Sequence, residues 1–127
     1  MRDPELFDVV QCYADGLFHC DTAKLHAAFH PSASLFDGEK GEIFAEPCAP
    51  FIHDIGQLEP TSPANLGQAP DSQILSVDWL SDVSAVVKLR IRARKSVYLD
   101  HLSLVKGANG WKIVSKVWHL EKVVDEI

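Results

Sequence analysis

The sequence predicts one α+β domain in which a curved antiparallel sheet packs against about three N-terminal helices. Apolar residues recur at helical spacing in the first third of the chain and alternate at period two after about residue 74. Helices that come first and hairpin-linked strands that follow are typical of this class. With 127 residues, 46% hydrophobic and 24% charged, we expect a single domain over residues 1–127.

The first helix is predicted to begin at Asp3-Pro4, where a capping acid precedes a proline in the first turn. Its apolar stripe comprises Leu6, Val10, Tyr13 and Leu17. A second helix should start after Asp21 as N-cap and end at Pro31. A third is predicted from about Pro50 to Leu58, because proline suits a first turn.

Strands are predicted both before and after the third helix. Two short ones, ASLFD and EIFAE, precede it. Residues 59–73 contain three prolines and one glycine and are predicted to form a loop, of a length that is often a lid or a mobile connection. Period-two alternation then predicts four strands, of which the last two are joined by a turn at residues 107–110.

Charge excludes some classes of partner. The formal net charge of −6 argues against general binding of nucleic acid or of an anionic membrane. No apolar run approaches the length of a membrane span. One strand carries a row of basic residues, which we interpret as a solvated face or a dimer rim paired with acids: Lys88, Arg90, Arg92 and Arg94.

Cysteines and histidines give no recognisable metal or disulfide motif. The three cysteines include no CxxC pair, so a reduced, cytoplasmic protein is expected. His26 and His30 have the i, i+4 spacing of a helical zinc pair, but no third ligand follows in a known pattern. We therefore expect no metal.

Two stretches carry a resemblance to a known superfamily: YADGLFHCDTAKLHAAFHPSASLFDG (13–38) and YLDHLSLVKGANGWKIVSKVWH (98–119). They are similar to the nuclear-transport-factor-2-like proteins, and most of all to the lumazine-binding and polyketide-cyclase-like groups. The resemblance implies a cone of helices closed by a bent sheet. It also implies a homodimer formed through the outer sheet face, for which the last strand offers Trp111, Ile113, Val114, Val117 and Trp118.

Ketosteroid isomerases share this cone, and three positions here resemble their catalytic residues. The resemblance implies that Asp37, at the end of FHPSASLFD, is a general base. It implies that Tyr13 and Asp100 stabilise an oxyanion. The chemistry would be cofactor-free proton transfer next to a carbonyl, giving isomerisation, cyclisation or dehydration. Residues 39–71 show no match, so pocket shape and substrate do not carry over.

Alternation along its strand places Asp100 in line with Leu102 and Leu104, on a face that reads as buried. A buried aspartate is expected to be neutral, and able to donate a hydrogen bond, unless a cation pairs with it. Lys116 on the next strand is the candidate cation, and a pair with it would leave a polar anchor for a ligand in place of an oxyanion hole. The hairpin register decides between them and cannot be read from sequence.

We expect a pocket between the first helix and the sheet for a small apolar or aromatic molecule with a carbonyl or hydroxyl. Its predicted lining residues are Leu17, Phe29, Phe51, Leu102, Lys116, Trp118 and His119. An Asp37 directed into the cavity would favour an enzyme, whereas an Asp37 that caps the turn at Gly38 would favour a non-catalytic binding module. A cavity filled by aromatic side chains would favour a structural dimerisation domain.

Overall fold

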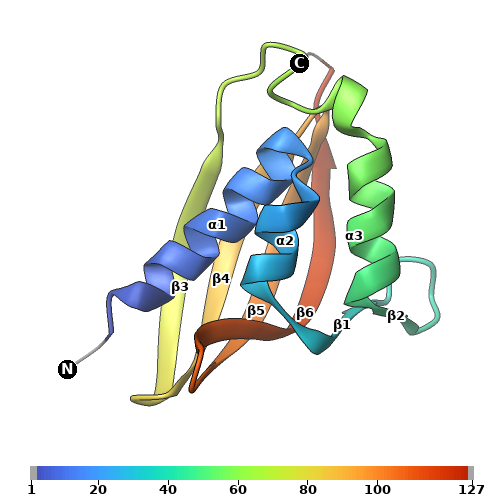
Figure 1. The fold of residues 1–127 in the computed structure, drawn as a ribbon. Coiled ribbons are helices and arrows are strands. Elements are labelled where there is room, and N and C mark those ends of the chain that lie inside the picture. The colour runs from blue at the N-terminus through green and yellow to red at the C-terminus, as the bar shows by residue number, and fades with distance from the viewer. Residues whose placement is uncertain (1–2, 126–127) are drawn as a thin grey trace.

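The chain folds as helices packed on the inner face of a curved sheet (Figure 1). The computed structural model describes residues 3–125. The elements are α1 (Glu5–His19), α2 (Thr22–Ala28), β1 (Phe29–Asp37), β2 (Phe44–Pro47), α3 (Cys48–Gln57), the 3₁₀ helix η1 (Glu59–Thr61), β3 (Ser72–Ser81), β4 (Ser84–Ala93), β5 (Ser96–Gly107) and β6 (Gly110–Val123). The predicted α+β class is confirmed. No helix among residues 3–125 is long and apolar enough to cross a membrane.

The six strands form one sheet in the order β2-β1-β6-β5-β4-β3. All neighbours are antiparallel except β1 and β6, which are parallel. The sheet therefore differs from the antiparallel one expected. Hairpin turns are visible in the sequence, but β1 and β6 are joined by most of the chain, so no local signal announces their pairing.

The second helix begins as predicted, because Asp21 is its N-cap and accepts a hydrogen bond from the Lys24 N–H at 3.2 Å. The N-cap of the first helix is Pro4 and not Asp3, although the Asp3 side chain accepts a hydrogen bond from the Glu5 N–H at 3.0 Å. The second helix ends at Ala28, three residues before the proline expected to end it, because Phe29 is already extended and begins β1.

Gly16 lies where α1 meets α2. A Cβ atom at this position would be 2.7 Å from Leu25 Cδ2, closer than packed carbon atoms approach. Glycine inside a helix is usually unfavourable, but here it lets the two helices pack closely. Their contact fixes the helical layer over the buried sheet residues Val87, Leu89, Leu102, Leu104 and Ile113.

A β-bulge in β6 changes which of its side chains face the core. Ile113 pairs with Leu104, whereas Ser115 pairs with Ser103, so Val114 is an extra residue in β6. Before the bulge Trp111 and Ile113 are buried, and after it Lys116 is. Strict alternation would have put Ile113 and Lys116 on opposite faces. The bulge brings both to the inner face.

The predicted basic row does not continue to its last member. Arg90 forms an ion pair with Glu121 of β6 at 3.0 Å, as expected for a solvated face paired with acids. Arg94, however, follows the end of β4 and has a positive φ of 59°, which takes it out of the alternation. Its side chain donates to the Thr61 carbonyl at 2.9 Å.

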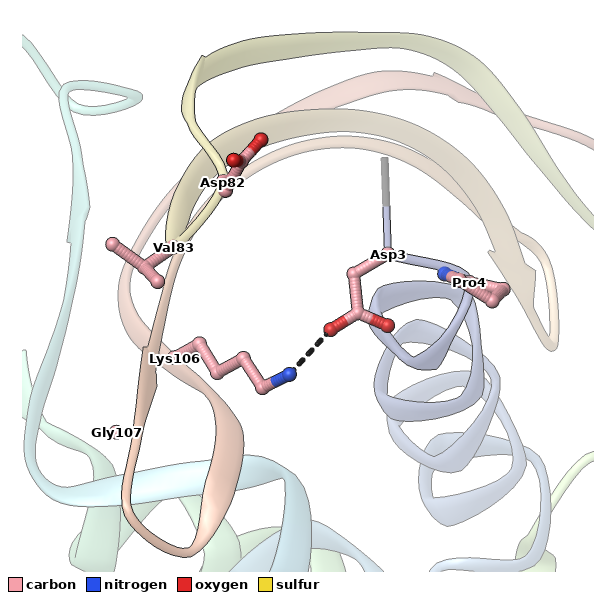
Figure 2. A pocket seen from close by; sticks show the side chains of 6 residues that line it. All are labelled: Asp3, Pro4, Asp82, Val83, Lys106 and Gly107. Carbon is pink, nitrogen blue, oxygen red and sulfur yellow. Dashed lines mark hydrogen bonds and ion pairs between the residues drawn. The ribbon is translucent and has the colours of Figure 1, made fainter. Parts of the chain in front are cut away.

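The start of α1 is tied to the β5–β6 hairpin through Asp3. Lys106 Nζ lies 2.6 Å from Asp3 Oδ2, and Trp111 Nε1 donates to the same oxygen at 3.0 Å. Figure 2 shows the Asp3 and Lys106 side chains pointing toward one another. Hydrogen bonds from Lys106, from the Glu5 N–H and from Trp111 lower the pKa of Asp3 from 3.8 to about 2.

We expect Asp3→Asn to destabilise the fold at neutral pH and to have little effect in acid. A carboxyl group whose pKa is lower in the folded state stabilises that state above its unfolded pKa and loses this contribution as pH falls toward the folded value. The difference in urea midpoint between wild type and Asp3→Asn should be full above about pH 5 and shrink between about pH 4 and pH 2. Asp54→Asn, at an exposed position on α3, is the control. A difference that does not change with pH would contradict this role.

Candidate functional site

A cavity of about 230 Å³ lies between the helices and the inner face of the sheet; we call it the inner pocket. Helices contribute Leu17, Phe51 and Ile55, the residue after α3 contributes Leu58, and strands contribute Leu35, Phe44, Ile91, Ala93, Tyr98 and Trp118. Its charged lining residues are Glu46, Arg94, Asp100 and Lys116. Ligand pockets usually measure about 300–1,000 Å³, so this one suits a small molecule.

Three buried polar residues lie together beside the inner pocket: Tyr13, Asp100 and Lys116, called here the polar cluster. Asp100 and Lys116 line the pocket, and Tyr13 lies behind them in the core. The Tyr13 hydroxyl donates to Asp100 Oδ2 at 2.5 Å. Lys116 Nζ lies 3.8 Å from the same oxygen. Asp100 is 1% exposed, and its other oxygen, Oδ1, is buried without a hydrogen-bond partner among the described residues. One carboxylate oxygen therefore accepts a hydrogen bond and lies in an ion pair, whereas the other has no partner among the described residues.

The cluster follows from the register of two strands and one helix. In the β5–β6 pair Leu102 is opposite Lys116 and Asp100 is opposite Trp118, so Asp100 and Lys116 are diagonal neighbours on the inner face. Tyr13 lies on the buried stripe of α1, which places its hydroxyl against β5. Of the two alternatives considered from the sequence, the structure therefore contains the ion pair between Asp100 and Lys116.

Burial controls the protonation of the two neighbours of Asp100. It raises the pKa of Tyr13 well above its usual value, and the nearby Asp100 raises it further, so the hydroxyl stays a donor. Burial lowers the pKa of Lys116, and attraction to Asp100 and Glu46 offsets only part of this effect. Lys116 Nζ also faces the Phe51 ring at 4.6 Å and the Tyr13 ring at 5.2 Å from their centroids.

Arg94 lines the inner pocket and fastens the loop that follows α3. Its guanidinium donates to the Thr61 carbonyl at 2.9 Å and lies 3.5 Å from Cys20 Sγ. The Gln68 side-chain amide bonds both the N–H and the carbonyl of Arg94, at 3.0 and 2.9 Å. The segment predicted to be a loop, residues 59–73, is thus tied to the end of β4.

Four of the seven predicted lining residues do line the inner pocket: Leu17, Phe51, Lys116 and Trp118. Phe29 and Leu102 instead pack in the core beside it. The His119 ring is largely exposed and contacts Glu39 at 2.7 Å, since residues 116 and 118 have the inward positions on β6. Glu46 and Arg94 were missed, because neither lies in a pattern that predicts an inward side chain.

Asp37 is the last residue of β1 and precedes the turn. Its Oδ1 accepts the Glu39 N–H at 3.0 Å, and it does not contribute to the wall of the inner pocket. The polar positions that resemble the isomerases are therefore divided: Tyr13 and Asp100 are in contact, whereas Asp37 caps a turn. This is the arrangement that favours a binding module.

The two histidines with helical spacing do not share a helix. His26 is in α2, but His30 is in β1, where its Nδ1 accepts the Ser32 N–H at 3.0 Å. Within residues 3–125 no group of three or more histidine, cysteine or acidic side chains is arranged to hold a metal ion.

We expect Tyr13→Phe to lower the free energy of unfolding by about 1–3 kcal/mol, because it removes a donor from a buried carboxylate. Tyr98→Phe is the matched control, because it deletes the hydroxyl of the only other tyrosine in the sequence. Tyr98 lines the inner pocket. The double variant Tyr13→Phe/Asp100→Leu should cost less than the sum of its single changes. Urea denaturation of the four variants and wild type measures this. Additive effects, or equal costs for the two tyrosines, would contradict the buried contact.

Comparisons with known proteins agree with this fold. The model of a family described as "Putative lumazine-binding" matches residues 2–119. A solved structure of a nuclear-transport-factor-2-like protein of unknown function from Silicibacter pomeroyi is 22% identical, with a TM-score of 0.78 over 91% of this chain and 92% of that one. A second such protein, from Shewanella baltica, is 20% identical, with a TM-score of 0.77 over 91% and 90%.

A ketosteroid isomerase-like protein from Erwinia carotovora atroseptica is 12% identical, with a TM-score of 0.62 over 91% of this chain and 92% of that one. At such identities these structures establish the fold alone. Comparison with curated proteins finds no match. The family match spans nearly the whole chain and confirms the resemblance seen in the sequence. The chain therefore belongs to this lumazine-binding family and has the nuclear-transport-factor-2-like fold.

Proposed function

We propose that this chain is a small-molecule-binding protein whose inner pocket holds a largely apolar or aromatic molecule by a hydroxyl or carbonyl group. The observation that carries the proposal is the buried, unpartnered Oδ1 of Asp100, a residue of the pocket wall. Leaving a buried acceptor without a donor costs about 1–3 kcal/mol. A ligand that donates to Oδ1 would remove this penalty and so gain affinity.

Lys116 supplies the complementary donor. Its Nζ lies 3.8 Å from the nearest carboxylate oxygen, beyond the usual length of a hydrogen bond, so it can donate to an acceptor on the ligand. A hydroxyl can use both groups at once. So can a ring with adjacent N–H and C=O groups, as in lumazine, the compound in the family's description. The walls formed by Phe51, Tyr98 and Trp118 suit a flat ligand.

Three contacts favour binding over isomerase chemistry. Asp37 is engaged in its turn, Tyr13 directs its hydroxyl to Asp100, and Lys116 lies beside Asp100. An oxyanion hole would need Tyr13 and a protonated Asp100 to aim their hydrogens at the ligand. In this arrangement Asp100 is instead an acceptor. A catalytic role for Asp37, with Tyr13 and Asp100, is the alternative that the experiment below separates.

Two further expectations belong to the same proposal. The free cysteines Cys12, Cys20 and Cys48 fit a reduced, cytoplasmic protein. We expect homodimerisation through the outer sheet face, and its main support is Val117 of β6, which is 50% exposed. Trp111 and Ile113 are in the core and Trp118 lines the pocket, so they are not available for it. Sedimentation equilibrium tests the dimer, and a monomer at all concentrations would contradict it.

We expect ligands of the right class to raise the melting temperature of the protein in a thermal-shift screen, because they bind only the folded state. The panel is lumazine and other pterins, flavins, simple phenols, polyketide aromatics and steroid-like enones. Asp100→Asn should weaken any hit about 10- to 100-fold, the effect of losing a hydrogen bond to a charged group. Asp37→Asn is the matched control and should leave affinity unchanged.

The outcomes separate the three functions. A hit that depends on Asp100 but not on Asp37 supports the binding protein. Turnover of an enone or related compound that is lost in Asp37→Asn would support the enzyme instead. A panel without any shift would contradict a ligand pocket and favour a structural role.

A further inference from the structure

We propose that Lys116 captures aldehyde or ketone ligands covalently, as an imine between its Nζ and the ligand's carbonyl carbon. The inference rests on the proposed function, since it needs the inner pocket to accept a small carbonyl compound. It narrows that function to one ligand class and assigns a nucleophile to the site.

The surroundings of Lys116 favour an uncharged, reactive amine. The residue is 6% exposed, which disfavours its ammonium form, whereas the Phe51 and Tyr13 rings, whose centroids lie 4.6 and 5.2 Å from its Nζ, favour that form. The ion pair with Asp100 Oδ2 also favours the ammonium, but at 3.8 Å it is longer than a direct hydrogen bond. An ammonium group that has left water and lacks close acceptors is destabilised relative to the free amine. Desolvation in an apolar pocket is a known way to activate a lysine nucleophile.

The titratable groups that face Lys116 come from three elements: the carboxyl groups of Asp100 on β5 and Glu46 on β2, and the neutral Tyr13 hydroxyl on α1. The two carboxylates attract the ammonium but do not cancel the effect of burial on the pKa of Lys116. The exposed lysines, such as Lys40 and Lys122, are solvated by water. Burial therefore favours the free amine form of Lys116 relative to a lysine in water.

The reaction balances without any further reagent. The Nζ lone pair forms a bond to the carbonyl carbon, and the C=O π electrons move to oxygen, which takes up a proton to give a carbinolamine. The C–O bond then breaks, and the oxygen leaves as water with the two protons of the amine. Lysine and carbonyl compound thus give imine and one water.

Asp100 is placed to stabilise both species. A carbinolamine hydroxyl can donate to its unpartnered Oδ1. A protonated imine keeps the positive charge at Nζ, beside Oδ2, so the carboxylate serves as its counter-ion. The apolar and aromatic walls limit the access of water and slow hydrolysis back to the free carbonyl.

The test is reductive trapping with benzaldehyde and sodium cyanoborohydride at neutral pH, followed by intact mass and peptide mapping. Reduction of the imine fixes the ligand as a secondary amine. We expect one adduct per chain, on Lys116, formed ahead of any on Lys40 or Lys122. In urea the unfolded chain should lose this preference, because the effect requires the folded pocket.

The matched variants are Lys116→Met and Lys112→Met, the same change on the same strand. Lys112 reaches outward to the Ala27 carbonyl at 2.7 Å. Lys116→Met should lose the adduct and Lys112→Met should keep it. If Lys116→Met fails to fold, peptide mapping of the wild type alone still decides the position. Benzyl alcohol, which matches benzaldehyde in shape but forms no imine, should protect Lys116 as a competitor.

Each result has one meaning. Preferential labelling of Lys116 that benzyl alcohol suppresses supports the inference. No adduct, or labelling spread over the surface lysines, overturns it. In that case a melting-temperature rise with benzyl alcohol shows that the pocket binds ligands without covalent capture, whereas no rise with either compound counts against the pocket as well.

Discussion

The structure depends on the burial of three polar side chains together in an otherwise apolar core. Tyr13 satisfies one oxygen of Asp100 and holds α1 against β5, 87 positions away in sequence. Lys116 on β6 lies 3.8 Å from the same oxygen. Removing either partner would leave a buried carboxylate with less compensation, which is among the costliest defects in a protein. Such a cluster contributes less to stability than an apolar core would, so a functional reason for it is expected.

The architecture supplies that cluster with a cavity. Parallel pairing of β1 with β6 brings Leu35 beside Lys116. The bulge at Val114 directs the Lys116 side chain to the same face of the sheet as the buried Trp111 and Ile113. The helices pack on the same face of the sheet (Figure 1). The inner pocket lies between them and the sheet, next to the polar residues. A strand with strict alternation could not bury both Ile113 and Lys116 on one face.

Local patterns predicted the class, the N-cap at Asp21, and the buried positions of Tyr13 and Asp100, because helical and strand periodicities are short-range signals. The parallel β1–β6 pair and the contact between Asp100 and Lys116 depend on register and on a bulge, which no short-range signal fixes. The Arg94 side chain reaches the inner pocket because this residue has a positive φ. A positive φ at a residue other than glycine is uncommon and is not predicted by the sequence pattern. Resemblance to isomerases placed Asp37 in a site, whereas its aspartate–glycine context was the better guide to the turn it caps.

The most direct test of the central claim is a crystal structure of the protein soaked with phenol, which cannot form an imine. We predict that phenol lies in the inner pocket, with its ring against Phe51 or Trp118 and its hydroxyl within hydrogen-bonding distance of Asp100 Oδ1 or Lys116 Nζ. Phenol bound only elsewhere, or an inner pocket closed by its own side chains, would contradict the view that the polar cluster is a ligand site.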